Sequence, residues 1–211
     1  MTDTIELLRR LGSASTKELA VEGVSPLKLQ RLVKAGQIER IGRGMYALPG
    51  FEKDQDSRMA SIAQSVTEAV VVLETAASLH GLTNRDVRTL WLAIPGRRGP
   101  LKVGQSDLAV RIVRWQPELI WGDPADPSKD VGIRTLRVAG RDIQITSPER
   151  TVADVWRYRN KLGMDFATEV VRLALASSRI DKDEIVRMAE LVGVARQIDP
   201  ILTAFNAPLV R

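Results

Sequence analysis

The feature that most constrains the fold is a capped helix that leads directly into a short basic hairpin, within residues 25–50. Ser25 is a favoured helix N-cap, Pro26 suits the first helical position and Gly36 suits the end, so a helix is predicted between them. The next stretch, IERIGRGMYALPG, has β-branched and aromatic residues on both sides of a Gly-Arg-Gly bend at 42–44. Because glycine supplies the positive φ of a tight turn, this pattern predicts a β-hairpin.

Two further helices are predicted before this one. TDTIELLRRLG has apolar residues at helical spacing and ends at Gly12, whereas STKELAVEG opens with Ser15 and Glu18 at capping-box spacing and ends at Gly23. Three helices, with a turn of two or three residues between the second and third, followed by a hairpin, have the layout of a winged helix-turn-helix. The core-facing side of the third helix is expected to hold Leu29, Leu32 and Val33.

The outward face of the third helix and the hairpin are both basic, which predicts contact with double-stranded DNA. Side chains in the N-terminal half of a recognition helix reach base edges, while other lysines and arginines contact phosphates. The residues expected near the bases are Ser25, Leu27, Lys28, Gln30 and Arg31. The alternative is a basic helix face that is only solvated.

Three more basic residues extend this candidate interface. Lys34 is expected to contact a phosphate, and Arg43, at the hairpin tip, is expected to reach the backbone or a minor groove. For Arg40 two interpretations stay open, DNA contact or a surface ion pair with Glu39 or Glu22.

Composition narrows the possible function classes. The 211-residue chain has a formal net charge of +5, which favours a polyanionic partner. It has no cysteine and one histidine, His80, so a disulfide or a typical His/Cys zinc site is excluded, and we expect no metal and no cofactor. No apolar run approaches the roughly 20 residues of a membrane helix, and the N-terminus lacks the order of a signal peptide. We therefore expect a cytoplasmic protein with no membrane partner.

The rest of the chain is predicted to form a second domain. We place the DNA-binding domain at residues 1–50 and the second domain at 51–211, with mixed α/β structure to about residue 146 and helices from 147. TLWLAIP and LAVRIVRW are predicted strands, and VGIRTLRVAGRDIQIT is a predicted hairpin that turns at Ala139-Gly140. The predicted fold class is α+β: an N-terminal winged helix-turn-helix followed by a mixed α/β domain with a helical C-terminus.

A second basic cluster surrounds the first of these strands. It consists of Arg85, Arg88, Arg97, Arg98 and Lys102. Charged residues between strands more often form a solvated loop, but contact with nucleic acid or with an acidic partner surface stays open.

Enzyme functions find little support in the residues. A catalytic triad would need His80, which stands at a predicted helix end and is expected to be structural. The chain has no nucleophile elbow, no Walker loop and no dinucleotide fingerprint, and no acidic residue stands two positions before a lysine, as it does in restriction-type nucleases. Of the tryptophans, Trp91, Trp115 and Trp156 are expected in the core, and Trp121 is expected to be the most exposed.

Four segments in order, RGMYALPG, TAASLHGLT, LWLAIP and SPERTVADVWRYRNKLGMDFATEVVRLAL, closely resemble the AbiEi family, the antitoxins of the AbiE type IV toxin-antitoxin systems of bacteria. The resemblance spans nearly the whole chain, and SPERTVAD followed by RYRNKLG is its most specific element. It implies that the winged helix binds inverted repeats in its own promoter and represses the operon. It also implies that the C-terminal domain counteracts a nucleotidyltransferase-type toxin, without necessarily forming a stable complex with it, and that the protein is not an enzyme.

By that likeness, the helix that begins at Ser147 becomes a candidate antitoxin surface, with Arg150, Asp154, Arg157 and Arg159 around it. The alternative is structural, because Ser147 and Pro148 start a helix and the i,i+4 pair of Arg150 with Asp154 is worth only about 0.3 kcal/mol on an exposed face.

The protein is expected to bind two DNA half-sites that form an inverted repeat. We expect it to be a monomer in solution or a dimer on DNA. Two other functions stay open. One is a ligand-responsive transcriptional regulator with no toxin partner, and the other is a DNA-anchored nuclease or modifying enzyme.

Overall fold

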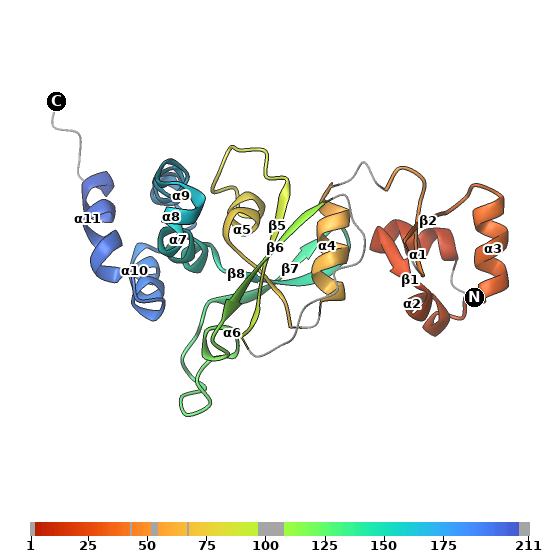
Figure 1. Ribbon diagram of the computed structural model, residues 1–211, viewed down its shortest axis with the longest axis horizontal. Helices are drawn as coiled ribbons and strands as arrows, with labels where there is room; N and C mark the ends of the chain where they lie inside the picture. Colours follow the sequence, from red (N-terminus) through yellow and green to blue (C-terminus); the bar gives the residue numbers. More distant parts are fainter. Residues whose placement is uncertain (1–2, 43, 52–54, 67, 97–107, 207–211) are drawn as a thin grey trace. The chain divides into compact units, whose positions relative to one another are not determined.

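The computed structural model describes residues 3–42, 44–51, 55–66, 68–96 and 108–206. The chain forms two compact units, whose elements are labelled in Figure 1. The first unit consists of Met1–Thr67, Pro100–Leu108 and Leu136–Ile143, and the second of Glu68–Gly99, Ala109–Thr135 and Gln144–Arg211. The first unit therefore continues past residue 50 and includes a short segment from much later in the chain.

Three capped helices open the first unit: α1 (Thr4–Leu11), α2 (Thr16–Val21) and α3 (Pro26–Lys34). Asp3, Ser15 and Ser25 each accept a hydrogen bond from a backbone N–H of the first turn that has no partner inside the helix. Glu18 completes the capping box of α2 by accepting from the Ser15 N–H. The predicted helices and their starts are confirmed.

A three-stranded antiparallel sheet completes the winged helix. Its strands are β1 (Ser13–Ser15), β2 (Glu39–Gly42) and β3 (Met45–Ala47), in the order β1-β3-β2. The predicted hairpin is confirmed as β2 and β3, whereas β1 is too short to leave an alternating pattern in the sequence. Helix α4 (Gln55–Ser65) follows.

The core of the winged helix draws on all three capped helices. It is formed by Leu7, Leu8, Ala14, Leu19, Val24, Leu29 and Ile38. Leu32 packs against this cluster, but Val33 is 37% exposed, so its predicted place in the core is wrong. Successive helical residues are separated by about 100°, so Leu32 and Val33 do not share one narrow face, and the core lies on the side of Leu32.

The second unit contains a mixed five-stranded sheet with the order β6-β5-β4-β8-β7. Its strands are β4 (Val70–Val71), β5 (Thr89–Pro95), β6 (Ala109–Trp115), β7 (Ile133–Val138) and β8 (Arg141–Thr146). The predicted strands TLWLAIP and LAVRIVRW correspond to β5 and β6, which run parallel. Strand β4 pairs antiparallel with β5 and parallel with β8.

The predicted turn at Ala139-Gly140 joins β7 to β8. Both residues have positive φ, 46° and 77°, which matches the two-residue turns that suit the twist of a hairpin. This turn and the strand residues beside it form the segment Leu136–Ile143, which groups with the first unit.

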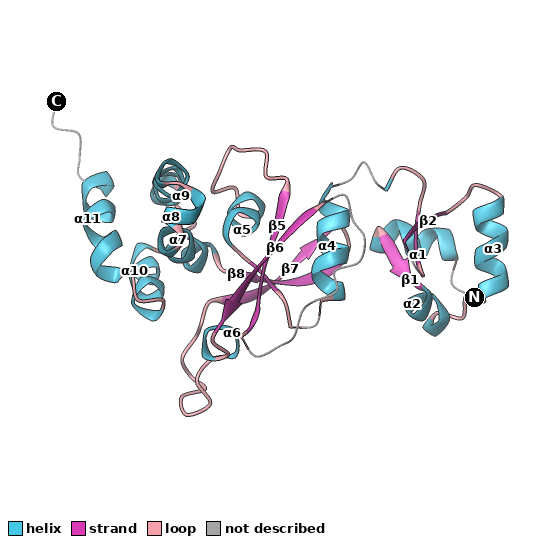
Figure 2. Cartoon of the chain, in the orientation of Figure 1, coloured by secondary structure: helices cyan, strands magenta, loops and turns pink. Residues whose placement is uncertain are grey.

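Helices follow and flank this sheet: α5 (Leu73–Leu79), α6 (Glu118–Trp121), α7 (Pro148–Arg157), α8 (Arg159–Leu162), α9 (Met164–Ala176), α10 (Lys182–Leu191) and α11 (Ala195–Asn206). Helix α7 packs against α5, α9 and α10, and Figure 2 shows the helical C-terminal region from α7 onward. Their shared core includes Val152, Val155, Trp156, Phe166 and Ile185.

The α+β fold class is confirmed. Within the described ranges, no helix is both long and apolar enough to cross a membrane.

The different burial of two apolar residues on α3 can be tested by mutation. We expect Leu29→Ala to lower the free energy of unfolding by about 2–5 kcal/mol, because it opens a cavity in the core of the winged helix. Val33→Ala should change it by about 0.5 kcal/mol or less, since an exposed side chain leaves no cavity. Urea denaturation of the two variants would measure both values. Equal losses would contradict the described orientation of α3.

Candidate nucleic-acid interface

Helix α3 presents most of its predicted DNA-contacting residues to solvent. Ser25, Leu27, Gln30, Arg31 and Lys34 are exposed, and Lys28 is half-buried. Four of them are spaced i, i+3, i+4 and i+7 and so form one continuous stripe along the helix: Leu27, Gln30, Arg31 and Lys34. The structure thus brings these predicted residues together on one face.

The composition of this stripe fits a duplex. Leu27 adds an apolar side chain, 57% exposed, to this otherwise polar face. In the part of the chain that the structure describes, Arg31 and Lys34 make no salt bridge, so their charges are not neutralised by neighbouring carboxylates. A helix with an amide side chain, a guanidinium and an apolar group in its stripe has the groups that read base edges.

The hairpin beside α3 is fixed to the start of α2. The carbonyl of Gly44 accepts hydrogen bonds from the backbone N–H of Thr16 at 2.7 Å and from its hydroxyl at 3.1 Å. Gly44 has φ +72°, which a residue with a side chain rarely adopts. Sequence reasoning missed Thr16, because no local motif marks a contact to a carbonyl so far along the chain.

Of the two arginines predicted in the hairpin, the structure describes Arg40 and not Arg43. Arg40 is exposed, lies opposite Tyr46 at an irregularity in the β2–β3 register, and has an interaction partner within the protein. Its DNA role stays a prediction. Arg43 lies outside the described residues.

The second predicted basic cluster is partly neutralised. The Arg85 Nε donates to Glu169 at 2.9 Å, and its guanidinium lies 5.2 Å from the ring centre of Phe166. Arg88 pairs with Asp86 at 2.7 Å on the surface. For these two residues the geometry favours a solvated, internally paired loop. The other three members, Arg97, Arg98 and Lys102, lie outside the described residues.

On α7, Arg150 is fully buried and cannot belong to a surface, which corrects its predicted place in a basic surface. Its Nε donates to Asp154 at 2.9 Å, and its two Nη atoms donate to the carbonyls of Val131 at 2.6 Å and Leu119 at 3.4 Å. The guanidinium also lies 4.9 Å from the ring centre of Trp115. Through these contacts, Arg150 joins α7 to the backbone at Val131 and Leu119 and to the ring of Trp115. The pair of Arg150 with Asp154 therefore stabilises the packing of the second unit.

The other arginines near this helix differ in exposure. Arg157 is exposed, whereas Arg159 is half-buried, donates to the Trp156 carbonyl at 2.9 Å and stacks over the Trp156 ring. Of the predicted surface on this helix, Arg157 is the member best placed to meet a partner.

His80 ends α5 with its ring Nε2 2.7 Å from the Thr146 carbonyl. Burial lowers the pKa of His80 although the Thr146 carbonyl opposes this, and a neutral ring with its proton on Nε2 still donates this hydrogen bond. The histidine ties α5 to the end of β8, as expected of a structural residue. Trp91, Trp115 and Trp156 are buried and Trp121 is exposed, as predicted.

Two family models match this chain. Residues 3–49 match a model described as a transcriptional regulator, AbiEi antitoxin. Residues 69–199 match the AbiEi antitoxin C-terminal domain. The chain belongs to the AbiEi antitoxin family. As a member of it, the protein is a DNA-binding antitoxin, and its two matched families are regulatory families and not enzyme families.

Among solved structures, the crystal structure of the RV2827C protein from Mycobacterium tuberculosis is similar to this AbiEi antitoxin. The match covers 98% of this chain and 81% of that one, with 15% sequence identity and a TM-score of 0.44. No curated protein matches the sequence significantly.

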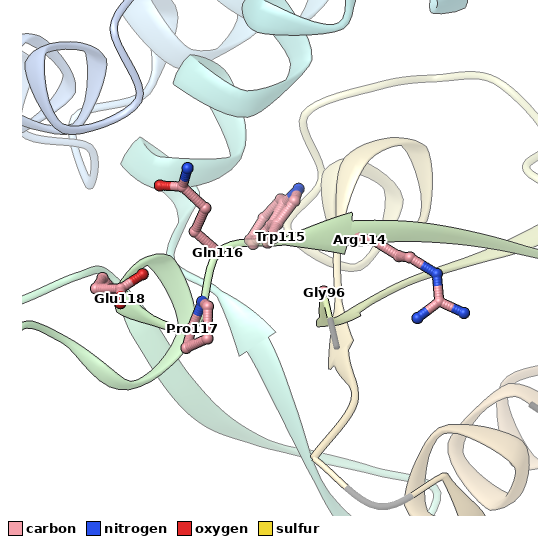
Figure 3. A pocket seen from close by; sticks show the side chains of 6 residues that line it. All are labelled: Gly96, Arg114, Trp115, Gln116, Pro117 and Glu118. Atoms are coloured by element: carbon pink, nitrogen blue, oxygen red, sulfur yellow. The ribbon is translucent and has the colours of Figure 1, made fainter. Parts of the chain in front are cut away.

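The second unit of this AbiEi antitoxin has a shallow hollow of about 710 Å³ at the end of β6. It is lined by Gly96, Arg114, Trp115, Gln116, Pro117 and Glu118. Figure 3 shows Arg114 and Glu118 on opposite sides of the hollow. Small-molecule sites are usually enclosed and apolar, so this open hollow is weak support for a ligand site.

The buried pair predicts a pH effect that Asp154→Asn should remove. Burial raises the pKa of Asp154 from 3.8 to about 6, and the charge of Arg150 opposes this rise. The folded state therefore holds the proton more tightly than the unfolded state. The stabilisation that comes from this tighter binding of the proton by Asp154 is fully present below about pH 4 and is lost as the pH rises through about 6.

Relative to Asp154→Asn, the unfolding free energy of the natural protein should fall by about 2 kcal/mol between pH 4 and pH 7. Urea denaturation at several pH values in this range would measure the difference. A difference that does not change with pH would show that the carboxyl group does not titrate there.

Proposed function

We propose that this AbiEi antitoxin represses its own operon by placing α3 in the major groove, and that it counteracts a nucleotidyltransferase-type toxin through its second unit. The observation that carries the first half is the exposed stripe of Leu27, Gln30, Arg31 and Lys34 on a capped helix. This helix lies inside the segment that matches the regulator model, residues 3–49.

Each residue of the stripe has chemistry suited to one part of the duplex. The Gln30 amide pairs bidentately with adenine, and the Arg31 guanidinium pairs with guanine, whereas Leu27 suits the methyl group of thymine. Lys34, one turn further along α3, suits a phosphate because an ammonium group acts as a point charge. Thr16 fixes the hairpin to the start of α2, and Arg43 remains a candidate from the sequence for contact with the DNA backbone or a minor groove.

Binding to inverted repeats follows from the geometry of such modules. Two copies of the protein would occupy half-sites one helical turn apart, or a multiple of it, and each would place one α3 in the major groove. The protein would then be a monomer in solution that pairs on DNA, or a dimer.

Support for the toxin half comes from the match of residues 69–199 to the AbiEi C-terminal domain. The exposed Arg157 at the end of α7 is our candidate contact for this activity, with the half-buried Arg159 beside it. Arg97, Arg98 and Lys102 remain candidates from the sequence. The ligand-responsive alternative would need an enclosed site, and the shallow hollow beside β6 does not favour it.

The DNA half is tested by two substitutions on α3 with a matched control. On a duplex from the gene's own upstream region, Arg31→Ala should weaken binding by about 1–3 kcal/mol and relax preference at one base pair. Lys34→Ala should weaken all sequences alike and reduce the slope of log affinity against log salt by about 0.9. Arg179→Ala, an exposed arginine of the second unit, removes the same charge and should leave binding unchanged.

Fluorescence anisotropy over a range of salt concentrations would measure these values. If both α3 variants bind as the natural protein does, the recognition helix has been assigned wrongly.

The toxin half is tested by growth of bacteria that co-express a nucleotidyltransferase from a neighbouring gene. The natural antitoxin should restore growth, and Arg157→Glu should reduce the rescue because it reverses the charge of the candidate contact. Arg179→Glu is the control and should rescue fully. DNA binding by both variants should be normal, which separates the two activities. Full rescue by Arg157→Glu would remove Arg157 from the antitoxin surface.

A further inference from the structure

The turn between β7 and β8 supplies a buried arginine to the first compact unit. Arg141 is only 3% exposed, although it belongs to a segment far from the helix-turn-helix in sequence. Its Nε donates to the carbonyl of Leu11, which lies 130 residues earlier, at 3.0 Å. Its Nη atoms donate to Glu18 at 3.4 Å, to Ser13 at 3.4 Å and to Gln64.

Three of these partners belong to the winged helix, and the fourth, Gln64, belongs to α4, which follows it. Leu11 is the last residue of α1, Ser13 begins β1, Glu18 is in the first turn of α2, and Gln64 is near the end of α4. The rigid, planar guanidinium has five N–H donors, so one side chain satisfies all four acceptors at fixed angles. Arg141 therefore links three helices and a strand at one point.

Glu18 connects Arg141 to the capping of α2. It accepts the Ser15 N–H at 2.6 Å with one carboxylate oxygen and the Arg141 guanidinium with the other. Burial alone would raise the pKa of Glu18, but hydrogen bonds from Ser15 and the nearby Arg141 lower it below its ordinary value. The carboxylate therefore stays charged and holds both partners at neutral pH.

Gly140 permits the approach of this turn to α1. Its φ is +77°, and a Cβ at this position would lie 1.6 Å from the carbonyl oxygen of Arg10. No side chain fits into that distance, so the turn rests directly on the backbone at the end of α1.

The position of α3 depends on the helices that Arg141 holds. Leu8 of α1, Leu19 of α2 and Leu29 of α3 are fully or almost fully buried in one core cluster. A close-packed core transmits a shift of α1 or α2 to α3, because it has no space in which to absorb the shift.

We propose that Arg141 is a positioning residue for DNA binding, which holds α1 and α2 so that α3 presents its exposed stripe correctly. This proposal rests on the proposed function of α3. It also means that the DNA-binding module is completed by the segment Leu136–Ile143, so that residues 1–50 alone lack one of its parts.

The test compares two arginines of the same hairpin, Arg137 on β7 and Arg141 on β8, in the full 211-residue chain. Arg141→Met should weaken binding to the upstream duplex by about tenfold or more, equivalent to about 1.4 kcal/mol. The control, Arg137→Met, removes an equal charge from an exposed residue whose ion pair within the described residues is with the exposed Asp142, and it should bind as the natural protein does. Both are measured at a temperature at which circular dichroism shows each variant to be folded.

Three further variants separate the effect of position from the effects of charge and of folding. Gly140→Ala keeps every charge but pushes the turn away from Arg10, and it should weaken DNA binding as Arg141→Met does. Gln64→Ala removes only one of the four acceptors and should have a smaller effect in the same direction, so the proposal stays testable if Arg141→Met does not fold. Arg141→Lys should fail to restore binding, since an ammonium group cannot reproduce the planar fork.

Hydrogen exchange supplies a readout that general stability would not change. In Arg141→Met and Gly140→Ala, amide exchange should accelerate at the start of α2 while the amides of α9 and α10 keep their protection. Uniform acceleration throughout the chain, or normal DNA affinity in both variants, would overturn the proposal.

The two proposals fail in different ways. If the natural protein does not bind the upstream duplex at low salt, the proposed function fails, and the role of Arg141 fails with it. If the natural protein binds and all the Arg141 and Gly140 variants bind equally well, only the positioning role is overturned.

Discussion

The second unit depends on one charge that is completely removed from water, the guanidinium of Arg150. Burying a charge costs several kcal/mol unless nearly every donor finds an acceptor. Here Asp154, two backbone carbonyls and the face of Trp115 surround it, so α7, α6, the loop before β7 and the end of β6 must all keep their places. Gly132 shows how closely the parts fit, because a Cβ there would lie 2.8 Å from the Cβ of Arg150. This accounts in physical terms for Arg150 and Asp154 of the run SPERTVAD.

Burial separates the arginines of this protein by role. Arg150 and Arg141 lie inside the protein with their N–H groups satisfied by backbone and side-chain acceptors, and both join segments that are distant in sequence. Arg31 is exposed on α3 and makes no salt bridge in the described part of the chain. An exposed and unpaired guanidinium keeps its capacity to bind a polyanion, whereas a buried one has already used it.

Local rules predicted the elements well and their contacts poorly. The N-caps at Ser15 and Ser25 were visible because a cap needs only the residues of one helical turn. The turn at Ala139-Gly140 was visible for a similar reason. By contrast, the exposure of Val33, the short strand β1 and the burial of Arg150 depend on neighbours elsewhere in the chain. An i,i+4 pair such as Arg150 with Asp154 has the same spacing on a wet surface as in a core.

The sequence by itself determined the order and type of the elements, the basic stripe on α3 and the family, because these depend on residue spacing within short segments. The tertiary structure decided which charged side chains are free to act. It placed Arg150 in the core and Arg157 in solvent on the same helix. It also brought Arg141 to the end of α1, a contact across 130 residues. Such contacts have no local signature, because the folded backbone alone brings these segments together.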